Sequence, residues 1–357
     1  MRVLSRAQAS RRRSAPEETA YEHPGLIRAV PQDNERAITA VDHRLTRLWT
    51  VWLRLSREQV NFTKRGFHAR NDTAKRALEA AGEAFIEGYN AALAQPALTL
   101  LAAALDRHPA EYRGFAYEGA AMALTVLDTL TPWRRRFAIF RDTVAVPHVY
   151  MVHVGAGWAL ARLRRRIEPF LEGCDPLLRW LIVDGYGFHE GYFHPERTIA
   201  EQQQPRHLSR AAARIFDQGL GRSLWFVCGA DVNQLAPKVA QFPSERRADL
   251  WSGIGLACAY TGGCDDEGIR ALSAAAASHR IHLAQGAAFA AKARARAGNM
   301  TAHTERACGL LCGVAAPKAA DVTDSALPGL PRDGKVETYE GWRTGTRELL
   351  MRELDLA

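Results

Sequence analysis

Apolar residues recur at helical spacing along most of this chain. Leu78, Phe85, Tyr89 and Leu93 follow one another at intervals of seven, four and four, so they would share one helix face. Alternating runs typical of strands are rare, and Leu224–Val227 is the one short candidate. The pattern predicts an all-α fold. Helices are expected at about 36–60, from Asp72 as N-cap, at 96–107, 111–128 and 148–166, from Asp175-Pro176, from Ser244 to Gly262-Gly263, at 266–297, and from about Tyr339.

Short patterns recur in the same order along the chain. Glu87-Gly88-Tyr89 returns 103 positions later as Glu190-Gly191-Tyr192, and Gly155-Ala156-Gly157 returns 98 positions later as Gly253-Ile254-Gly255. These offsets predict a duplicated helical bundle, or a helical-repeat-like core, with pseudo-twofold halves and a ligand cleft between them. The predicted segments are a flexible basic arm at 1–35, a first helical half at 36–170, a second half at 171–312, a linker at 313–338 and a C-terminal helix at 339–357.

The repeated glycines have two interpretations. Glycine within a helix costs roughly 0.5–1 kcal/mol relative to alanine, so its repeated use indicates that another backbone or a ligand approaches closely. Close packing of helices is the simpler reason, and a ligand lying flat on a glycine surface is the other. On the second interpretation, aromatic residues near the glycines complete a substrate-binding surface. Its candidates are Gly155, Gly157, Trp158, Trp251, Gly253, Gly255, Tyr89, Tyr186 and Tyr192.

Candidate chemistry is densest in residues 184–194, which hold two carboxylates, two imidazoles and two tyrosines. In a helix Glu190 and His194 share a face, which would place an acid or base beside an imidazole. The predicted catalytic set is Glu190, His194, His189 and Asp184, with Glu87 facing Glu190 from the other half. Two buried carboxylates in one cavity would raise the pKa of one of them. The alternative is a purely structural polar cluster.

Neither a metal nor an organic cofactor is predicted. His189 and His194 are five apart and do not form the HExxH pattern of zinc enzymes, so the segment is a weak metal-ligand candidate. Gly219-Leu220-Gly221 lacks the third glycine and the strand of a dinucleotide-binding fingerprint. The six cysteines are scattered and include no CxxC pair, which is typical of reduced thiols in a cytosol.

The chain has a formal charge of +8, and its isoelectric point is near 9.4. Much of the excess lies in the first 13 residues and in the runs Arg134–Arg136 and Arg164–Arg166. Solvated helix ends explain such runs more simply than a nucleic-acid site, so nucleic acid is an unlikely partner. No signal peptide and no apolar run of membrane-spanning length is recognisable. A cytoplasmic protein without a membrane span is therefore predicted.

Several long strings resemble one protein family. They are FAYEGAAMAL (115–124), HVGAGWALARL (153–163), DPLLRWLIVDGYGFHEGYFH (175–194), GRSLWFVCGADV (221–232) and RRADLWSGIGLACAYTGG (246–263). They are similar to the UnbL-like proteins, a domain-of-unknown-function family of bacterial enediyne biosynthetic gene clusters, over residues 80–312. The resemblance implies secondary metabolism, namely antibiotic biosynthesis, and a polyketide-derived polyene as ligand. It implies other enzymes of the cluster as further partners, and it assigns no catalytic residue.

Three functions remain open at the level of sequence. The first, slightly favoured, is a cofactor-free biosynthetic enzyme that processes an apolar polyene intermediate by acid–base chemistry. The second is a non-catalytic carrier that shields or delivers such an intermediate. The third is a helical scaffold that binds a partner through its stacked surface.

Overall fold

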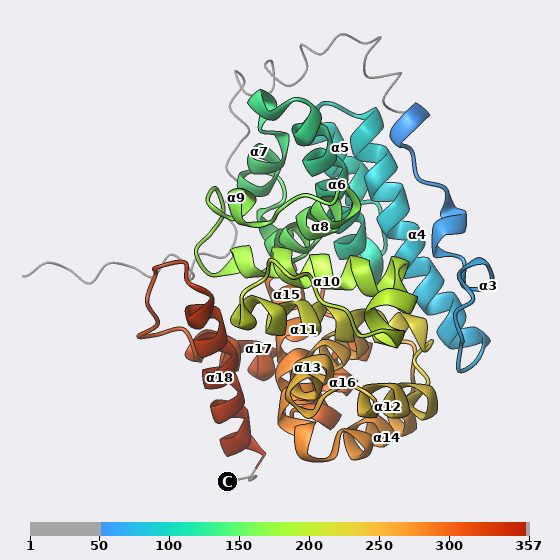
Figure 1. Ribbon diagram of the computed structural model, residues 1–357, viewed down its shortest axis with the longest axis vertical. Coiled ribbons are helices and arrows are strands. Elements are labelled where there is room, and N and C mark those ends of the chain that lie inside the picture. Colours follow the sequence, from blue (N-terminus) through green and yellow to red (C-terminus); the bar gives the residue numbers. More distant parts are fainter. Residues whose placement is uncertain (1–50, 355–357) are drawn as a thin grey trace, which may run out of the picture.

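The computed structural model describes residues 51–354, and in this range the chain is helical, without any strand. Seven long helices pack on one another in chain order and form a stack along the longest axis of the molecule (Figure 1). Two more helices, α17 (Ala316–Ser325) and α18 (Val336–Glu353), pack against the last of the seven. The stacked helices are α4 (Asp72–Ala94), α6 (Ala110–Leu130), α8 (Val149–Arg162), α10 (Leu181–Phe193), α11 (Arg210–Val227), α13 (Ser244–Thr261) and α15 (Arg280–Ala297).

Short helices occupy the connections between the long ones. On one side of the stack α12 (Val232–Ala240), α14 (Asp266–Ala276) and α16 (Ala302–Leu311) pack in sequence (Figure 1). The connections also hold a π-helix at Glu196–Ala200. The remaining short elements are η1 (Arg57–Val60), α3 (Phe62–Arg65), α5 (Leu98–Leu105), η2 (Pro132–Arg134), α7 (Arg136–Asp142), η3 (Val146–His148), α9 (Glu168–Leu171), η4 (Leu178–Trp180) and η6 (Ala277–His279).

Glycines hold the stack together by letting helix backbones touch. A Cβ atom on Gly157 of α8 would overlap the carbonyl of Ile182 in α10, and one on Gly185 of α10 would overlap the carbonyl of Val154 in α8. The same reciprocal contact recurs at four further helix pairs. The glycines concerned are Gly88 and Gly119 (α4 and α6), Gly187 and Gly219 (α10 and α11), Gly221 and Gly253 (α11 and α13), and Gly255 and Gly286 (α13 and α15). The structure therefore supports the packing interpretation of these glycines.

The short patterns that recur about 100 residues apart lie three stacked helices apart. Gly155 and Gly253 lie in α8 and α13, with α10 and α11 between them. The predicted boundary at 170/171 falls between α8 and α10, which pack as closely as the other neighbours do. The pseudo-twofold arrangement of two halves is therefore not confirmed, and a continuous stack describes the contacts directly.

Several predicted elements differ from the structure. The candidate strand Leu224–Val227 belongs to α11, where the stack buries an apolar run on several sides. The predicted linker at 313–338 contains α17, which packs on α15. The predicted helix at 266–297 is broken at Ala277, whose φ of 48° is left-handed. The arm at 1–35 and most of the predicted helix at 36–60 lie outside the described residues.

Substituting alanine for Gly253 is expected to lower the free energy of unfolding by about 1–3 kcal/mol, because the new methyl group would push α13 away from the backbone of α11. Gly309→Ala is the matched control. Gly309 lies in α16, where a Cβ would meet no atom, so alanine there should stabilise the helix slightly. Urea unfolding of both variants measures the difference, and equal effects would contradict the packing role.

Candidate apolar cavity and its neighbouring polar pocket

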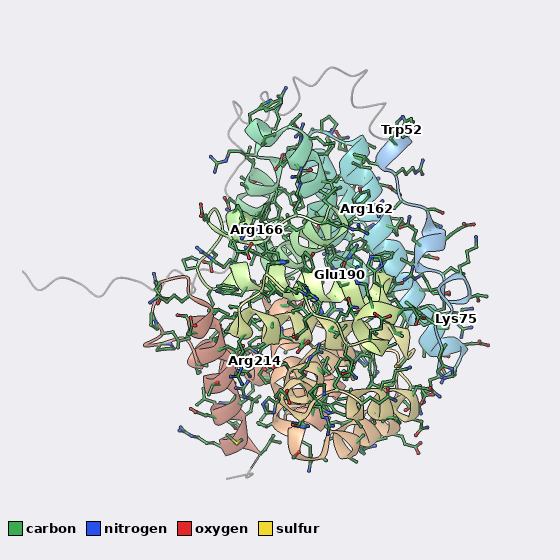
Figure 2. The ribbon with its side chains drawn as sticks, in the orientation of Figure 1. Trp52, Lys75, Arg162, Arg166, Glu190 and Arg214 are labelled. Atoms are coloured by element: carbon green, nitrogen blue, oxygen red, sulfur yellow. The ribbon has the colours of Figure 1, made fainter. Side chains whose placement is uncertain are left out.

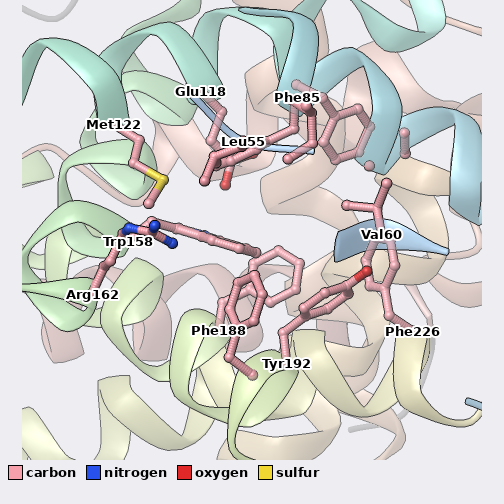
Figure 3. A pocket seen from close by; sticks show the side chains of 15 residues that line it. Leu55, Val60, Phe85, Glu118, Met122, Trp158, Arg162, Phe188, Tyr192 and Phe226 are labelled. Carbon is pink, nitrogen blue, oxygen red and sulfur yellow. The ribbon is translucent and has the colours of Figure 1, made fainter. Parts of the chain in front are cut away.

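A narrow apolar cavity lies where five consecutive helices of the stack meet. Helices α4, α6, α8, α10 and α11 line it, and the segment that precedes α4 covers it (Figure 3). Its cavity volume is about 30 Å³, and the space between the lining atoms, open solvent included, is about 500 Å³. Two of its lining residues, Glu118 and Arg162, carry ionisable groups, and the others are mainly apolar, apart from the Tyr192 hydroxyl and the Trp158 indole nitrogen. These walls suit an apolar ligand, which would have to displace side chains or the covering segment to enter.

Aromatic rings form the walls of this cavity. The ring centroid of Trp158 in α8 lies 4.7 Å from that of Phe85, 4.9 Å from that of Phe188 and 5.9 Å from that of Tyr192. Figure 3 shows the Trp158 ring edge-on, with Met122 and Glu118 on one side and Phe188 and Tyr192 on the other. A thin, flat ligand suits such a slot, since it would contact ring faces on one side and aliphatic groups on the other.

The segment that covers the cavity, residues 55–60, is held in place by contacts with α4. The Asn90 side chain accepts a hydrogen bond from Leu55 N at 3.0 Å and donates one to Leu55 O at 2.9 Å. Val60 rests on Gly82, where a Cβ atom would come within 2.7 Å of the Val60 Cβ. Leu55 and Val60 both reach the cavity. The cover is therefore seated by a few specific contacts near its apolar residues.

Glu118 is the buried carboxyl group of the cavity. It lies in α6 with 1% of its surface exposed, and neither carboxyl oxygen has a hydrogen-bond partner. Burial, reinforced by the negative charge of Asp184 and opposed by Arg222, raises the pKa of Glu118 to about 8. At neutral pH this side chain is therefore a carboxylic acid, able to donate a proton or a hydrogen bond. Figure 3 shows it directed into the gap above Trp158.

A chain of buried polar groups lies behind Glu118. Arg222 of α11 bonds to Asp184 Oδ1 at 2.5 Å, and Gln218 Nε2 donates to Asp184 Oδ2 at 2.7 Å. Ser252 then bonds to Gln218 at 3.3 Å and to Gln285 at 3.0 Å. Asp184 was predicted as catalytic, but the structure buries it completely in this network, where it balances the charge of Arg222.

Glu190 of α10 borders a different pocket, which is polar. His189 Nδ1 lies 3.2 Å from Glu190 Oε1, and Arg197 donates to Oε2 at 2.9 Å. His194 Nε2 is 4.0 Å from Oε1. Burial alone would raise the pKa of Glu190, but the hydrogen bond from His189 and the charges of His194 and Arg197 outweigh it and lower the pKa. Burial lowers the pKa of His189, so a neutral imidazole donates to an ionised carboxylate.

Glu87 does not share a pocket with Glu190. Its side chain is 40% exposed, pairs with Arg57 and lies 3.8 Å from His108 Nε2. It lines a surface pocket that also includes Asn90. The predicted pair of facing carboxylates is thus corrected. Gly88 must face α6, and the adjacent Glu87 therefore points away from the stack. The raised pKa expected of such a pair is found at Glu118 instead.

The predicted substrate-binding residues are dispersed. Trp158 and Tyr192 line the apolar cavity, and Tyr186 lines the polar pocket. Tyr89 is buried in α4 with no hydrogen-bond partner for its hydroxyl, and Trp251 is buried in α13. Gly155, Gly157, Gly253 and Gly255 face neighbouring backbones, which leaves no room for a ligand against them.

Glu118 is not among the residues predicted from the sequence, although the sequence around it contains a recognisable indication. The run Phe115–Leu124 is apolar except for Glu118, and a carboxylate inside an apolar run is either paired or functional. Of the cysteines, all six are free. Within residues 51–354 no three His, Cys, Asp or Glu side chains are grouped to hold a metal ion.

Among the described helices, none has the length and apolar character to span a bilayer by itself. Pro132–Asp142 and Val146–Arg162 would reach that length together, but they are bent by 86° relative to each other.

Comparison with protein-family models decides the affiliation. A model described as "Protein of unknown function (DUF1702)" matches residues 44–350, which is most of the chain. The chain belongs to this family. The DUF1702 match covers all seven stacked helices and both pockets. Searches of curated proteins and of solved structures found no match. A domain-of-unknown-function family was expected and is found, but the DUF1702 description mentions neither UnbL-like proteins nor enediyne clusters and assigns no reaction.

Proposed function

We propose that the chain binds a flat, unsaturated apolar chain in the cavity under residues 55–60 and exchanges a proton with it through Glu118. The observation that carries this proposal is the buried, unpartnered carboxyl group of Glu118 inside an apolar, aromatic-walled slot, where burial raises its pKa to about 8. A carboxylic acid kept neutral by an apolar site is a recurrent proton donor in enzymes.

The surroundings of Glu118 suit both states of such a donor. Proton donation would break the Glu118 O–H bond, form a bond from hydrogen to the ligand and leave the electron pair on the carboxylate. The charge of Arg222 would stabilise that carboxylate, while Asp184 keeps the acid form favoured at rest. The same carboxylate could then recover a proton from another position of the ligand, so that no external oxidant or reductant is consumed.

The resemblance to UnbL-like proteins supports the class of ligand. Enediyne biosynthesis passes through a polyketide-derived polyene, which is thin, planar and apolar, as the slot requires. We therefore place the activity in the processing of such an intermediate, with other enzymes of the pathway as the partners that supply and receive it. Entry to the slot would require the segment around Leu55 to leave Asn90, or the exposed Arg162 side chain to move aside.

Binding of methyl parinarate, a neutral fluorescent polyene ester, tests this proposal. Wild-type protein is expected to bind it with a dissociation constant in the micromolar range or below. Met122→Trp, which fills the slot, should weaken binding by about tenfold or more. Met351→Trp in α18 is the matched control and should leave binding unchanged. Absence of saturable binding by the folded wild-type protein would refute the proposal.

A further inference from the structure

The polar pocket beside the apolar cavity is basic. It has a volume of about 300 Å³ and lies between the end of α8, α10, α11 and the connection after α10. Two guanidinium groups and two imidazoles line it, from Arg164, Arg197, His194 and His207, against the single carboxylate of Glu190. Both oxygens of Glu190 already accept hydrogen bonds, so Glu190 cannot pair with the remaining donors. The pocket therefore holds more cationic and N–H groups than acceptors.

Arg164 supplies most of this excess. Within residues 51–354 its exposed side chain has no ion-pair or hydrogen-bond partner, and its backbone is left-handed with a φ of 49°, which few non-glycine residues adopt. Burial and the charge of Glu190 raise the pKa of Tyr186, while the charges of Arg197 and Arg164 oppose that rise. The Tyr186 hydroxyl and both guanidinium groups therefore act on one space, as in a site for an oxyanion.

The two pockets are neighbours at the C-terminal ends of α8 and α10. Arg162 and Phe193 line the apolar cavity, whereas Arg164 and His194, only two and one residues further along the chain, line the polar pocket. Arg162 is exposed at the cavity and, within the described part of the chain, pairs with no carboxylate. Figure 2 labels Arg162 and Glu190 on these two helices near the middle of the stack. A ligand chain leaving the cavity beside Arg162 would therefore emerge on the side of the molecule where the basic pocket lies.

We propose that the polar pocket binds a phosphate-type oxyanion attached to the ligand whose chain occupies the apolar cavity. This inference rests on the proposed function. Guanidinium groups bind such oxyanions through paired hydrogen bonds, and Tyr186 and the imidazoles add further donors. The substrate class is therefore an unsaturated chain carrying a phosphate group, and Arg164 is the residue that selects for that group.

Displacement of methyl parinarate by decyl phosphate and by decanol tests the assignment. Both carry the same chain, so the phosphate is the only difference between them. Decyl phosphate is expected to displace the probe at a concentration about tenfold lower or more. Arg164→Gln should reduce this advantage to less than threefold. The control is Arg166→Gln, since Arg166 belongs to the same arginine run, is exposed and faces Glu168 instead. This control should keep the full advantage.

The outcomes separate the two proposals. Equal displacement by decanol and decyl phosphate, with the probe bound normally, overturns the phosphate assignment and leaves the apolar site standing. Failure of wild-type protein to bind methyl parinarate overturns the proposed function itself. Inorganic phosphate alone distinguishes the source of the anion. If it raises the melting temperature of wild-type but not of Arg164→Gln protein while decyl phosphate has no advantage, the pocket serves a free anion and the attached-phosphate assignment is wrong.

Discussion

The wild-type chain is expected to lose stability as the pH rises from about 4.5 to about 8, and Glu118→Gln is expected to remove this pH dependence. The unfolded chain ionises this group near pH 4.5, whereas the folded chain retains its proton up to about pH 8. Folded protein therefore binds more protons across this window, and stability falls with rising pH until the folded group ionises. A difference of 3.5 pKa units, at 1.36 kcal/mol each, corresponds to about 5 kcal/mol.

Urea unfolding at intervals from pH 4 to pH 9 measures this effect. The difference in stability between wild type and Glu118→Gln should grow up to about pH 8 and then level off. Glu87→Gln, at an exposed glutamate of the neighbouring helix, provides the control and should leave the wild-type profile unchanged. Infrared spectra at pH 6.5 should show the carbonyl band of a protonated carboxyl group in wild type and not in Glu118→Gln. Parallel pH profiles for wild type and Glu118→Gln would contradict a protonated Glu118.

Asp184→Ala is expected to lower the free energy of unfolding by about 3–5 kcal/mol, because it strands the charge of Arg222 inside the stack. Arg222 would then stabilise the ionised form of Glu118 more strongly, so the pH dependence assigned to Glu118 should weaken in this variant. Chemical denaturation at pH 7 measures the first effect, and the pH series measures the second.

Two further variants separate charge from packing at this position. Asp184→Leu combined with Arg222→Met removes both charges and should recover most of the lost stability. Asp266→Ala removes a half-exposed carboxylate that faces Arg306 and Arg270, and it should cost less than about 1 kcal/mol. A double variant as unstable as Asp184→Ala would show that shape rather than the unpaired charge determines the loss.

The helical fold could be predicted because the periodicity of apolar residues is a local property. The stack could not, since its order depends on which glycine meets which backbone. Gly157 and Gly185 reveal their contact only when α8 and α10 are placed together. The predicted linker shows the same limit, because α17 is short and polar and is ordered by packing on α15.

Part of the candidate site could be predicted from the sequence, namely two of its aromatic residues, whereas Glu118 was not predicted. Trp158 and Tyr192 were expected near a ligand and line the cavity, since large aromatic residues beside glycines fill the spaces between helices. Glu190 and His194 were expected to share a helix face, and their side chains lie 4.0 Å apart. The hydrogen bond to Glu190 comes from His189 instead, and together with the nearby positive charges it lowers the pKa of Glu190, so the raised pKa belongs to Glu118. Neighbours in sequence reveal such pairs, whereas the burial of Glu118 depends on four other helices.

Backbone contact at glycine fixes the distance between adjacent helices, and this has a consequence for the slot. Side chains lining it can exchange rotamers, but they cannot move α8 closer to α10 or further away while Gly157 and Gly185 touch the opposite main chain. Substitutions of lining residues by larger ones would thus narrow the slot or shorten it, but substitutions by smaller ones would not draw the two helices closer together. Bulky saturated rings should be refused by every family member that keeps these two glycines.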